Sequence, residues 1–430
     1  MKGNEIKYID FTSLYPYTNK YCEYPVGHPV IITRDFQDIS AYFGFIKCLI
    51  LPPRGLYHPV LPYRSNKKLL FPLCRTCADN MQQEPCRHSD AERAIRGVWV
   101  SEEVKVAVEM GYIILMIYEV YHFPQRSKDL FKTYIDTFLK IKQEASGWPS
   151  ECLTDEEKDV YLRNYEEHEG IKLEKKQVLK NPGLRAVAKL ALNSFWGRFG
   201  MRENLSQTTF VKSTPDMNRF LSDPKISING MNIVNESVME ITWAYKEEYL
   251  PQQSLTNIFI AAFTTCHARL KLYSTLHQLG RAVLYYDTDS VIYVSDGKND
   301  PPLGDFLGEF TDELEGDHIV NFISGGPKNY AYRTSRGKEC LKVRGFTLNY
   351  SASKKITFDT MHRLVSIFQP AKAKRQRILE EEPVVVINPK KITRDKRGKR
   401  LITKEERKKY QVVYDKRVLQ PDFSTLPYGF

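Results

Sequence analysis

A short hairpin with two carboxylates at its tip constrains the fold of this chain more than any other segment. Residues 283–286 and 291–294 are apolar and include β-branched side chains, and only the sequence DTDS lies between them. Two such segments around a tight turn predict an antiparallel β-hairpin. The fold must then hold Asp287 and Asp289 close together on rigid strands.

Two neighbouring anions at a turn suggest a bound cation. Like charges a few ångströms apart repel, so one carboxyl group would otherwise take up a proton. A divalent metal ion removes this conflict, which makes the turn a candidate metal platform. An ordinary turn is the alternative interpretation, because Asp, Thr and Ser are common turn residues. Two other segments of the chain favour the metal.

The first segment lies near the N-terminus. Residues 6–11 read as a strand that ends near Asp10, so a third carboxylate stands at a strand end. The backbone amides of Ser13, Leu14 and Tyr15 in the following turn can form an anion cradle. The Tyr15 ring would restrict what lies above this cradle, and a packed core tyrosine is the alternative.

The second segment is a helix predicted over residues 181–200, with Asn181 as N-cap and Pro182 at the first helical position. A polar stripe at spacings of four, four and three consists of Arg185, Lys189, Asn193 and Trp196. The opposite face is predicted to point to the core and consists of Leu184, Val187, Ala188, Ala191, Leu192 and Phe195. The stripe has cations to bind phosphates and a ring to stack on a base. A solvated face is the alternative.

The motifs DFTSLYP (10–16), KLALNSFWG (189–197) and YYDTDS (285–290), in this order, resemble the palm and fingers motifs of family B DNA polymerases. The match is close to the protein-primed type of viruses, linear plasmids and self-synthesising DNA transposons. Two further segments agree: GPKNY (326–330) resembles the family's K-x-Y element, and KVRG (342–345) resembles the basic strand that follows it.

The resemblance implies an α+β fold of the right-hand polymerase type, with an antiparallel palm sheet backed by helices and a small inserted module. The expected domains are a first palm segment (1–50), an insertion with a Cys/His cluster (51–125), fingers helices (126–202), a second palm segment (203–366) and a basic thumb-like module (367–430). Only nine residues precede Asp10. We therefore expect a sequence without the family's exonuclease domain, as a fragment of a longer product rather than a stand-alone core.

The resemblance also implies roles for the residues of the hairpin, the N-terminal turn and the helix. Asp10 and Asp289 would bind two Mg²⁺ or Mn²⁺ ions, with Asp287 as the supporting carboxylate. Tyr15, beside the amides of Ser13 and Leu14, would exclude a 2′-hydroxyl.

The remaining implied residues contact nucleotide and DNA. Lys189 would hold the triphosphate, assisted by Arg185, and Asn193 would line the nucleotide pocket. The four positions implied to contact DNA are Lys328, Tyr330, Lys342 and Arg344. Trp196 stands where the family usually has Tyr, so its indole keeps the stacking surface but lacks a phenolic hydroxyl.

The implied function is template-directed DNA synthesis by nucleotidyl transfer, with release of pyrophosphate and a two-metal mechanism. The implied partners are a DNA template and primer, deoxynucleoside triphosphates and a terminal priming protein, in the replication of a virus-like or mobile element. Two alternatives stay open: a catalytically silent nucleic-acid-binding remnant, and a reverse transcriptase or other palm polymerase.

Charge is consistent with a nucleic-acid partner. The chain has 63 Lys and Arg against 52 Asp and Glu, a net charge of +11, and residues 390–417 hold 13 basic and 4 acidic residues. Such a stretch attracts phosphates. We expect it to be ordered, with strand segments on both sides of a turn at Gly398 and a short helix opened by the Thr403 and Glu406 capping-box pattern. Nuclear targeting is the alternative use of these cations.

The predicted insertion contains Cys74, Cys77, Cys86 and His88 in the pattern C-x2-C-x8-C-x-H. The C-x2-C half is typical of a zinc knuckle, whereas the short C-x-H half is not typical of common zinc fingers. A structural zinc site and four unligated residues are both open. In protein-primed relatives an insertion at this place contacts the priming protein and the template.

Periodicity predicts the remaining elements. Ser127 is expected to cap a helix that contains Leu130, Phe131, Tyr134, Ile135, Phe138 and Leu139 and runs antiparallel to the 181–200 helix. Residues 147–170 are expected to form a solvated connection, and 203–250 strands and loops of a second insertion. A long helix over 257–278 is expected beneath the palm sheet, with Cys266 and His267 as packing residues.

The sequence has no apolar run of transmembrane length and no signal-peptide pattern. We therefore expect a soluble intracellular protein without membrane partners, acting in the nucleus or at a viral replication site. Its eight cysteines are expected to be reduced.

Overall fold

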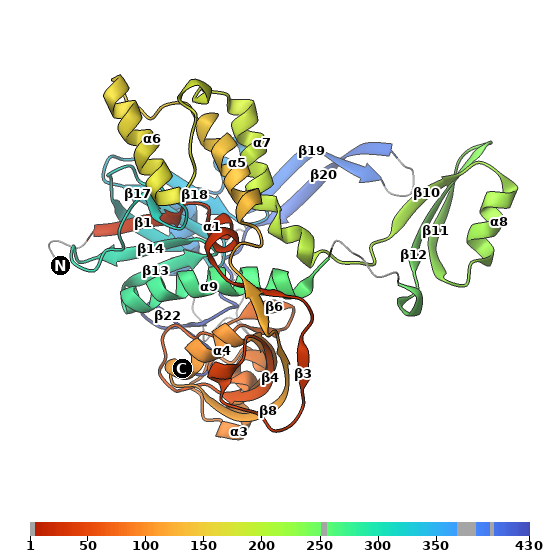
Figure 1. Cartoon of the computed structure of the whole chain (residues 1–430), viewed down its shortest axis with the longest axis horizontal. Coiled ribbons are helices and arrows are strands. Elements are labelled where there is room, and N and C mark those ends of the chain that lie inside the picture. The colour runs from red at the N-terminus through yellow and green to blue at the C-terminus, as the bar shows by residue number, and fades with distance from the viewer. Residues whose placement is uncertain (1–4, 251–255, 368–383, 396–399) are drawn as a thin grey trace. The chain divides into compact units, whose positions relative to one another are not determined.

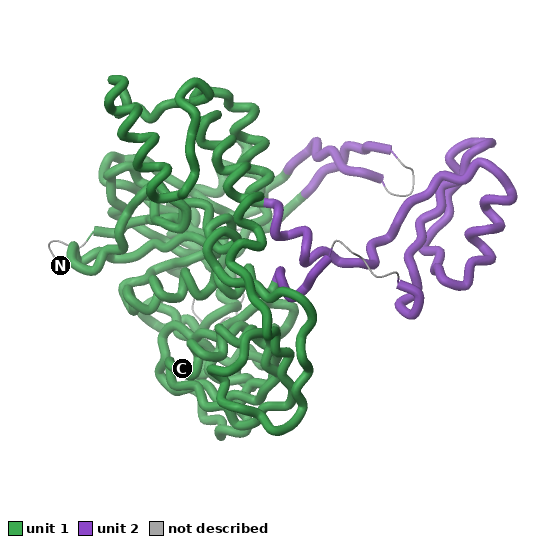
Figure 2. The backbone as a smooth tube through the Cα atoms, in the orientation of Figure 1, with its two compact units in different colours: residues 1–193, 262–387, 407–430 green, residues 194–261, 388–406 purple. Residues whose placement is uncertain are grey.

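The computed structural model describes residues 5–250, 256–367, 384–395 and 400–430. The chain divides into two compact units, of which the first contains residues 1–193, 262–387 and 407–430 and the second contains 194–261 and 388–406 (Figure 2). The expected five-fold division into palm, insertion, fingers and thumb segments stays a prediction. Within the described residues, no helix combines the length and the apolar character needed to cross a lipid bilayer.

The centre of the first unit is a seven-stranded antiparallel sheet (Figure 1). Its strands are β1 (Glu5–Phe11), β13 (Val283–Asp287), β14 (Ser290–Ser295), β15 (Phe310–Asp312), β16 (Ile319–Ser324), β17 (Asn329–Thr334) and β18 (Glu339–Val343). The order is β13-β14-β1-β16-β17-β18, and β15 also pairs with β1. The N-terminal strand therefore lies in the middle of a sheet built from the C-terminal half of the chain. This arrangement confirms the predicted antiparallel sheet and the predicted hairpin.

One long helix, α9 (Ile258–Leu279), covers a face of this sheet (Figure 1). Its residues Ala268, Leu272 and Leu276 pack in one core cluster with Ile9 of β1 and Val291 of β14. The predicted helix beneath the sheet is thus confirmed. Its Cys266 is fully buried, and the His267 ring forms a hydrogen bond with the Glu23 carbonyl oxygen, in agreement with their expected packing roles.

A second sheet has the order β3-β8-β4-β7, and it joins two strands of residues 30–51, expected in the first palm segment, to two strands of the expected insertion (51–125). Its strands are β3 (Val30–Ile32), β4 (Gly44–Leu51), β7 (Ile95–Val100) and β8 (Ile113–His122), and helix α4 (Ser101–Glu109) lies between β7 and β8 in the chain. Shorter elements around it are η1 (Ile39–Ala41), β5 (Tyr63–Ser65), β6 (Lys68–Leu70), α2 (Arg75–Asn80) and α3 (Asp90–Arg93). Strands β2 (Tyr24–Val26) and β9 (Gln125–Ser127) pair with each other and flank this sheet in the chain.

Helix α1 (Leu14–Tyr21) follows β1, and helices α5 (Lys132–Glu144), α6 (Asp155–Glu169) and α7 (Pro182–Ser194) follow β9. Tyr134 near the start of α5 donates a hydrogen bond to the Ala191 carbonyl near the end of α7, and the Asn181 amide donates to the Ala145 carbonyl. The two helices are therefore antiparallel, as predicted (Figure 1).

Two predictions in this region are wrong. Helix α5 begins at Lys132, because the Ser127 hydroxyl instead accepts a hydrogen bond from the Asp129 amide and closes a local turn. The expected solvated connection contains helix α6, which is capped by Thr154 and buries Tyr165 and Glu169. The prediction did not include a helix, although α6 is exposed along most of its length apart from these two residues.

Helix α7 begins as predicted, with the Asn181 side chain accepting a hydrogen bond from the Leu184 amide at 3.1 Å. It ends at Ser194 and continues as the 3₁₀ helix η3 (Trp196–Gly200). The prediction that the whole apolar face of α7 points to the core is wrong. Within this helix only Ala188 and Leu192 are buried, and Val187 is 62% exposed. The helix packs through a narrow strip of its surface, so part of its apolar face is left exposed.

The second unit contains a three-stranded sheet in the order β10-β12-β11. Its elements are β10 (Gln207–Val211), α8 (Thr214–Ser222), β11 (Ile226–Asn235), β12 (Val238–Tyr245) and η4 (Glu247–Tyr249). The Trp243 indole donates to the Thr209 hydroxyl across β12 and β10 at 3.0 Å. The predicted strands are confirmed, but the prediction of strands and loops alone missed helix α8.

The basic C-terminal region forms a hairpin of β19 (Val385–Asp395) and β20 (Arg400–Lys409). The predicted turn at Gly398 lies outside the described residues. The predicted short helix at Thr403 is wrong, because Thr403 and Glu406 lie within β20 and the Glu406 carboxylate forms an ion pair with Lys391 across the hairpin. The other elements near the C-terminus are α10 (Tyr350–Ser353), α11 (Phe358–Ser366), β21 (Val418–Leu419) and β22 (Thr425–Leu426).

Candidate active site

The β13–β14 hairpin places its two carboxylates at a two-residue turn. Asp287 pairs with Ser290 in register, and the Asp287 side chain accepts hydrogen bonds from the amide and hydroxyl of Thr288 at 3.0 and 3.2 Å. The turn is held against β1, because the Phe11 amide donates to the Asp289 carbonyl at 2.8 Å. Asp10 is the register partner of Ser290. The structure thus brings the three predicted carboxylates together on adjacent strands.

The electrostatics of this cluster show that the carboxylates are crowded. Burial, followed by the charges of Asp289 and Glu313, raises the pKa of Asp10 to about 7, and the Lys189 ammonium opposes this shift. Burial and then Asp287 raise the pKa of the Asp289 carboxyl, and Lys328 opposes that shift. A cation that binds between the carboxylates would relieve both shifts.

Lys328 lies directly beside the hairpin. Its ammonium is 3.0 Å from the Asp287 carboxylate, and its backbone amide donates to the Tyr285 hydroxyl at 3.0 Å. The Tyr285 and Tyr330 rings lie 4.9 Å apart between centroids. Residues 326–330, which are predicted to contact DNA, therefore contact strand β13, which carries Asp287. The sequence alone did not reveal this contact.

The predicted anion cradle lies at the start of α1. Ser13 is the N-cap and has a left-handed backbone with φ of 53°, so the first turn begins at Leu14. The amides of a first helical turn lack acceptors within the helix and form an anion site. Burial and then the Asp289 charge raise the pKa of Tyr15, which places this ring near the carboxylates.

Three cationic side chains, Lys142, Arg185 and Lys189, lie beside this cradle. The sequence did not lead us to predict Lys142. The Lys142 ammonium of α5 is 3.5 Å from the Ser13 hydroxyl, and burial, then Arg185 and Lys189, lower its pKa. The Arg185 guanidinium donates to the Ser146 hydroxyl at 3.0 Å. Lys142 could have been found, because it continues the buried helical stripe of Ile135 and Leu139, where a lysine is unexpected.

Four predicted site residues remain, namely Asn193, Trp196, Lys342 and Arg344. Asn193 is exposed near the end of α7, and Trp196 belongs to the second unit. Lys342 is the register partner of Tyr330, and Arg344 is exposed just after β18. Their predicted roles stay predictions. In the insertion, the structure brings Cys74, Cys77, Cys86 and His88 into one cluster.

The known proteins that resemble this chain are DNA polymerases. Residues 1–152 and 162–279 match the family described as DNA polymerase type B, organellar and viral. A probable DNA polymerase of Neurospora intermedia is 24% identical over 362 residues, which cover 80% of this chain and 31% of that protein. A probable DNA polymerase of Podospora anserina is 24% identical over 347 residues, which cover 73% of this chain and 23% of that protein. The chain thus spans less than a third of the length of these relatives.

Solved structures share the fold. Phi29 DNA polymerase complexed with primer-template DNA has a TM-score of 0.55 at 15% identity, covering 95% of this chain and 58% of that one. Its ternary complex with primer-template DNA and incoming nucleotide substrates has a TM-score of 0.54 at 15% identity, covering 96% and 58%. The predicted α+β polymerase fold is confirmed.

Proposed function

This chain belongs to the organellar and viral type B DNA polymerases, and from that premise we propose that it catalyses template-directed addition of deoxynucleotides to a primer 3′-hydroxyl. One observation carries the proposal: Asp10, Asp287 and Asp289 meet on adjacent strands within the electrostatic reach of Lys189. The proposed partners are a DNA template and primer, deoxynucleoside triphosphates and a terminal priming protein, in the replication of a virus-like or mobile element.

The residues fit the two divalent cations that this chemistry uses. Carboxylate oxygens suit Mg²⁺ or Mn²⁺, and the raised pKa values of Asp10 and Asp289 show unrelieved negative charge at the site. Asp10 and Asp289 would hold the ions, with Asp287 in support and already paired with Lys328. When bound, the metals lower the pKa of the attacking hydroxyl and neutralise phosphate charge.

The chain's own residues bind and orient the substrates. In our proposal the amides of Ser13 and Leu14 and the side chains of Lys142, Arg185 and Lys189 bind the triphosphate. Their charges converge at the start of α1, next to the carboxylates. Phosphoryl transfer depends chiefly on such positioning and charge neutralisation.

Specificity and DNA contacts are assigned to neighbouring residues. Tyr15 is the proposed gate against a 2′-hydroxyl, supported by its electrostatic coupling to Asp289. Asn193 and Trp196 are proposed to line the nucleotide pocket. The proposed primer and template contacts are Lys328, Tyr330, Lys342, Arg344 and the basic β19–β20 hairpin.

Primer extension by the purified chain with Mg²⁺ tests the proposal. We expect incorporation on a DNA template and a loss of about 1000-fold in Asp289→Asn, the order of effect seen when a preorganised electrostatic group is removed. Asp305→Asn, an exposed carboxylate, is the matched control with unchanged activity. Full activity of Asp289→Asn would overturn the assigned site.

Two further outcomes identify the alternatives. Salt-sensitive binding of primer-template without incorporation would indicate a silent nucleic-acid-binding remnant. Preference for an RNA template over a DNA template would indicate a reverse transcriptase.

A further inference from the structure

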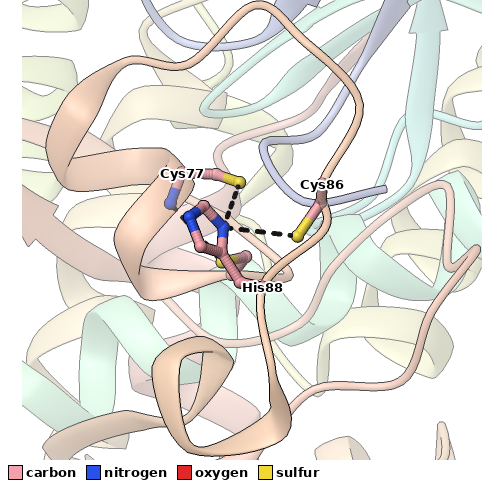
Figure 3. Close-up of side chains that lie close together, drawn as sticks. Cys77, Cys86 and His88 are labelled. Carbon is pink, nitrogen blue, oxygen red and sulfur yellow. Dashed lines mark hydrogen bonds between the residues drawn. The ribbon is translucent and has the colours of Figure 1, made fainter.

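Four side chains of types that can bind a metal, Cys74, Cys77, Cys86 and His88, lie close together, and Figure 3 shows Cys77, Cys86 and His88. Cys74 is the N-cap of α2, Cys77 lies in its first turn, and Cys86 and His88 follow in the loop before α3. The Nδ1 atom of His88 lies 3.5 Å from the Cys74 sulfur, 3.3 Å from the Cys77 sulfur and 3.6 Å from the Cys86 sulfur. All four ligand atoms lie within 4.8 Å of one another.

These distances fit a tetrahedral zinc site. With Zn–S bonds of about 2.3 Å and Zn–N bonds of about 2.05 Å at the tetrahedral angle, the nitrogen and each sulfur are about 3.6 Å apart. The three observed distances are all close to this value. Four protein ligands would close the coordination shell, which is typical of structural rather than catalytic zinc.

Hydrogen bonding alone does not account for the cluster. The Nδ1 atom of a neutral imidazole offers one N–H or one lone pair, so it can satisfy one sulfur and not three. The Cys77 amide also donates to the Cys74 sulfur at 3.4 Å, but the three thiols would still share a single nitrogen. A cation at the centre satisfies all four ligands at once.

The C-terminal segment packs against the same cluster. The Tyr428 ring is 1% exposed and, together with Val418, shares a hydrophobic core with Cys74 and Cys77. The Leu73 amide, one residue before the first ligand, donates a hydrogen bond to the Tyr428 carbonyl at 2.7 Å.

The backbone at Gly429 lies so close to Cys74 that there is no room for a side chain at position 429. Gly429 has φ of +89°, and a Cβ atom there would lie 2.3 Å from the Cys74 Cβ and 2.6 Å from its amide nitrogen. The position of Tyr428 and Gly429 therefore depends on where the backbone of Leu73 and Cys74, the first ligand, lies.

The ligand loop itself has little regular structure to hold it. Helix α2 has six residues and α3 has four, and the segment 82–89 between them is largely exposed. Cross-linking Cys86 and His88 to α2 would fix this loop, because metal binding in such small modules supplies folding free energy.

We propose that Cys74, Cys77, Cys86 and His88 bind one structural zinc ion, and that this ion holds residues 415–430 against the insertion. Thiolate and imidazole ligands in tetrahedral geometry select zinc over Mg²⁺. The proposal concerns the insertion and does not depend on polymerase activity.

Metal analysis of the purified full chain tests the first half. We expect one zinc per chain by elemental mass spectrometry, and less than one-tenth of that in Cys86→Ser. Cys152→Ser is the matched control, because Cys152 lies outside the cluster and should leave the zinc content unchanged. A wild-type chain that contains no zinc and binds none on titration would overturn the site, as would a disulfide between any two of the three cysteines.

Hydrogen exchange tests the second half. Removal of zinc by a chelator should accelerate exchange of the Leu73 amide and of residues 418–428, while strand β14 of the palm sheet stays protected. Unchanged exchange in these segments after complete zinc removal would overturn the link between the metal and the C-terminal segment.

A glycine variant tests the packing of the C-terminal segment on Cys74 even if Cys86→Ser does not fold. Gly429→Ala should retain one zinc but expose residues 418–428 to faster exchange, because the added methyl group collides with Cys74. Gly55→Ala is its matched control in the same insertion, with a φ of +76° and open space around the new methyl group. Equal exchange in the two variants would contradict the proposed packing.

Discussion

The Lys328 ammonium lies 3.0 Å from the Asp287 carboxylate, and this contact joins the turn before β17 to the tip of the β13–β14 hairpin. The Lys328 backbone is fixed as well, because its amide donates to the Tyr285 hydroxyl. Asp287 is thus already engaged by a cation of the protein. This contact supports the proposed division of labour, in which Asp289 is the principal metal ligand and Asp287 the supporting one.

Replacement of Lys328 should alter the pH dependence of the reaction. Burial and Asp287 raise the pKa of Asp289, and Lys328 opposes them, so Lys328→Gln should raise this pKa further. We expect activity to fall about 10-fold near neutral pH, as for loss of one charged contact, and to fall more at lower pH. Primer-extension rates measured as a function of pH check this, with the exposed Lys338→Gln as control. Superimposable pH profiles for Lys328→Gln and wild type would contradict it.

Asp10 should destabilise the metal-free fold at neutral pH. Burial raises its pKa to about 7 in the folded chain, so the folded state binds the proton more tightly than the unfolded state. The protonated Asp10 carboxyl group stabilises the fold below about pH 4, and this contribution is lost as the pH rises through about 7. Asp10→Asn should therefore raise the melting temperature at pH 8 and change it little at pH 4, while it abolishes primer extension.

Thermal unfolding in the presence of a chelator measures this effect. Asp296→Asn is a control of opposite sign, because backbone hydrogen bonds from Asn299 and Lys298 lower the pKa of Asp296. An equal gain in melting temperature at both pH values would show that ionisation of Asp10 is not the cause.

Lys142 should contribute to nucleotide binding. Its ammonium lies near Ser13 and close enough to Arg185 and Lys189 to have its pKa lowered by them. Lys142→Met keeps the length of the side chain and removes the charge, and we expect the KM for deoxynucleotides to rise about 10-fold or more. Steady-state kinetics separate KM from kcat. Lys140→Met, on the more exposed side of the same helix, should leave KM unchanged, and equal KM values in the two variants would refute the role.

A buried ion pair links α1 to α6. The Lys20 ammonium is 2.9 Å from the Glu169 carboxylate, and their side chains are 1% and 2% exposed. The Glu169 carboxylate also accepts hydrogen bonds from the Tyr21 hydroxyl and the Leu307 amide. Lys20→Met leaves this buried carboxylate without its cation, and we expect a loss of about 3–5 kcal/mol in the free energy of unfolding.

Urea unfolding of the whole chain measures this loss. The double variant Lys20→Met with Glu169→Leu should recover some of the stability, because the buried Glu169 charge is gone. Asp136, which Lys20 also contacts at 2.8 Å, keeps its pair with Lys132. Lys47→Met is the control, since its pair with Glu119 is partly exposed and should contribute less than about 1 kcal/mol. A loss in Lys20→Met no larger than in Lys47→Met would contradict the prediction.

Sequence reasoning succeeded where the signal was local. The turn between β13 and β14, the Asn181 cap and the long helix α9 each follow from turn chemistry, capping or periodicity within a few residues. It failed where a distant residue changed the outcome. Thr403 and Glu406 carry a helix signal, but Lys391 on the opposite strand pairs with Glu406 and the segment is a strand.

By itself, the sequence determined that three carboxylates end strands of one sheet and that a helix with a cationic stripe accompanies them. Only the tertiary structure decided which groups surround them: Lys328 beside Asp287, Lys142 beside Ser13, and Tyr428 against the cysteine cluster. The physical reason is that local patterns fix backbone conformation, whereas burial and charge pairing depend on residues brought together from far apart in the chain. The four residues DTDS were enough to predict the hairpin turn, but they were not enough to predict which charges surround its carboxylates.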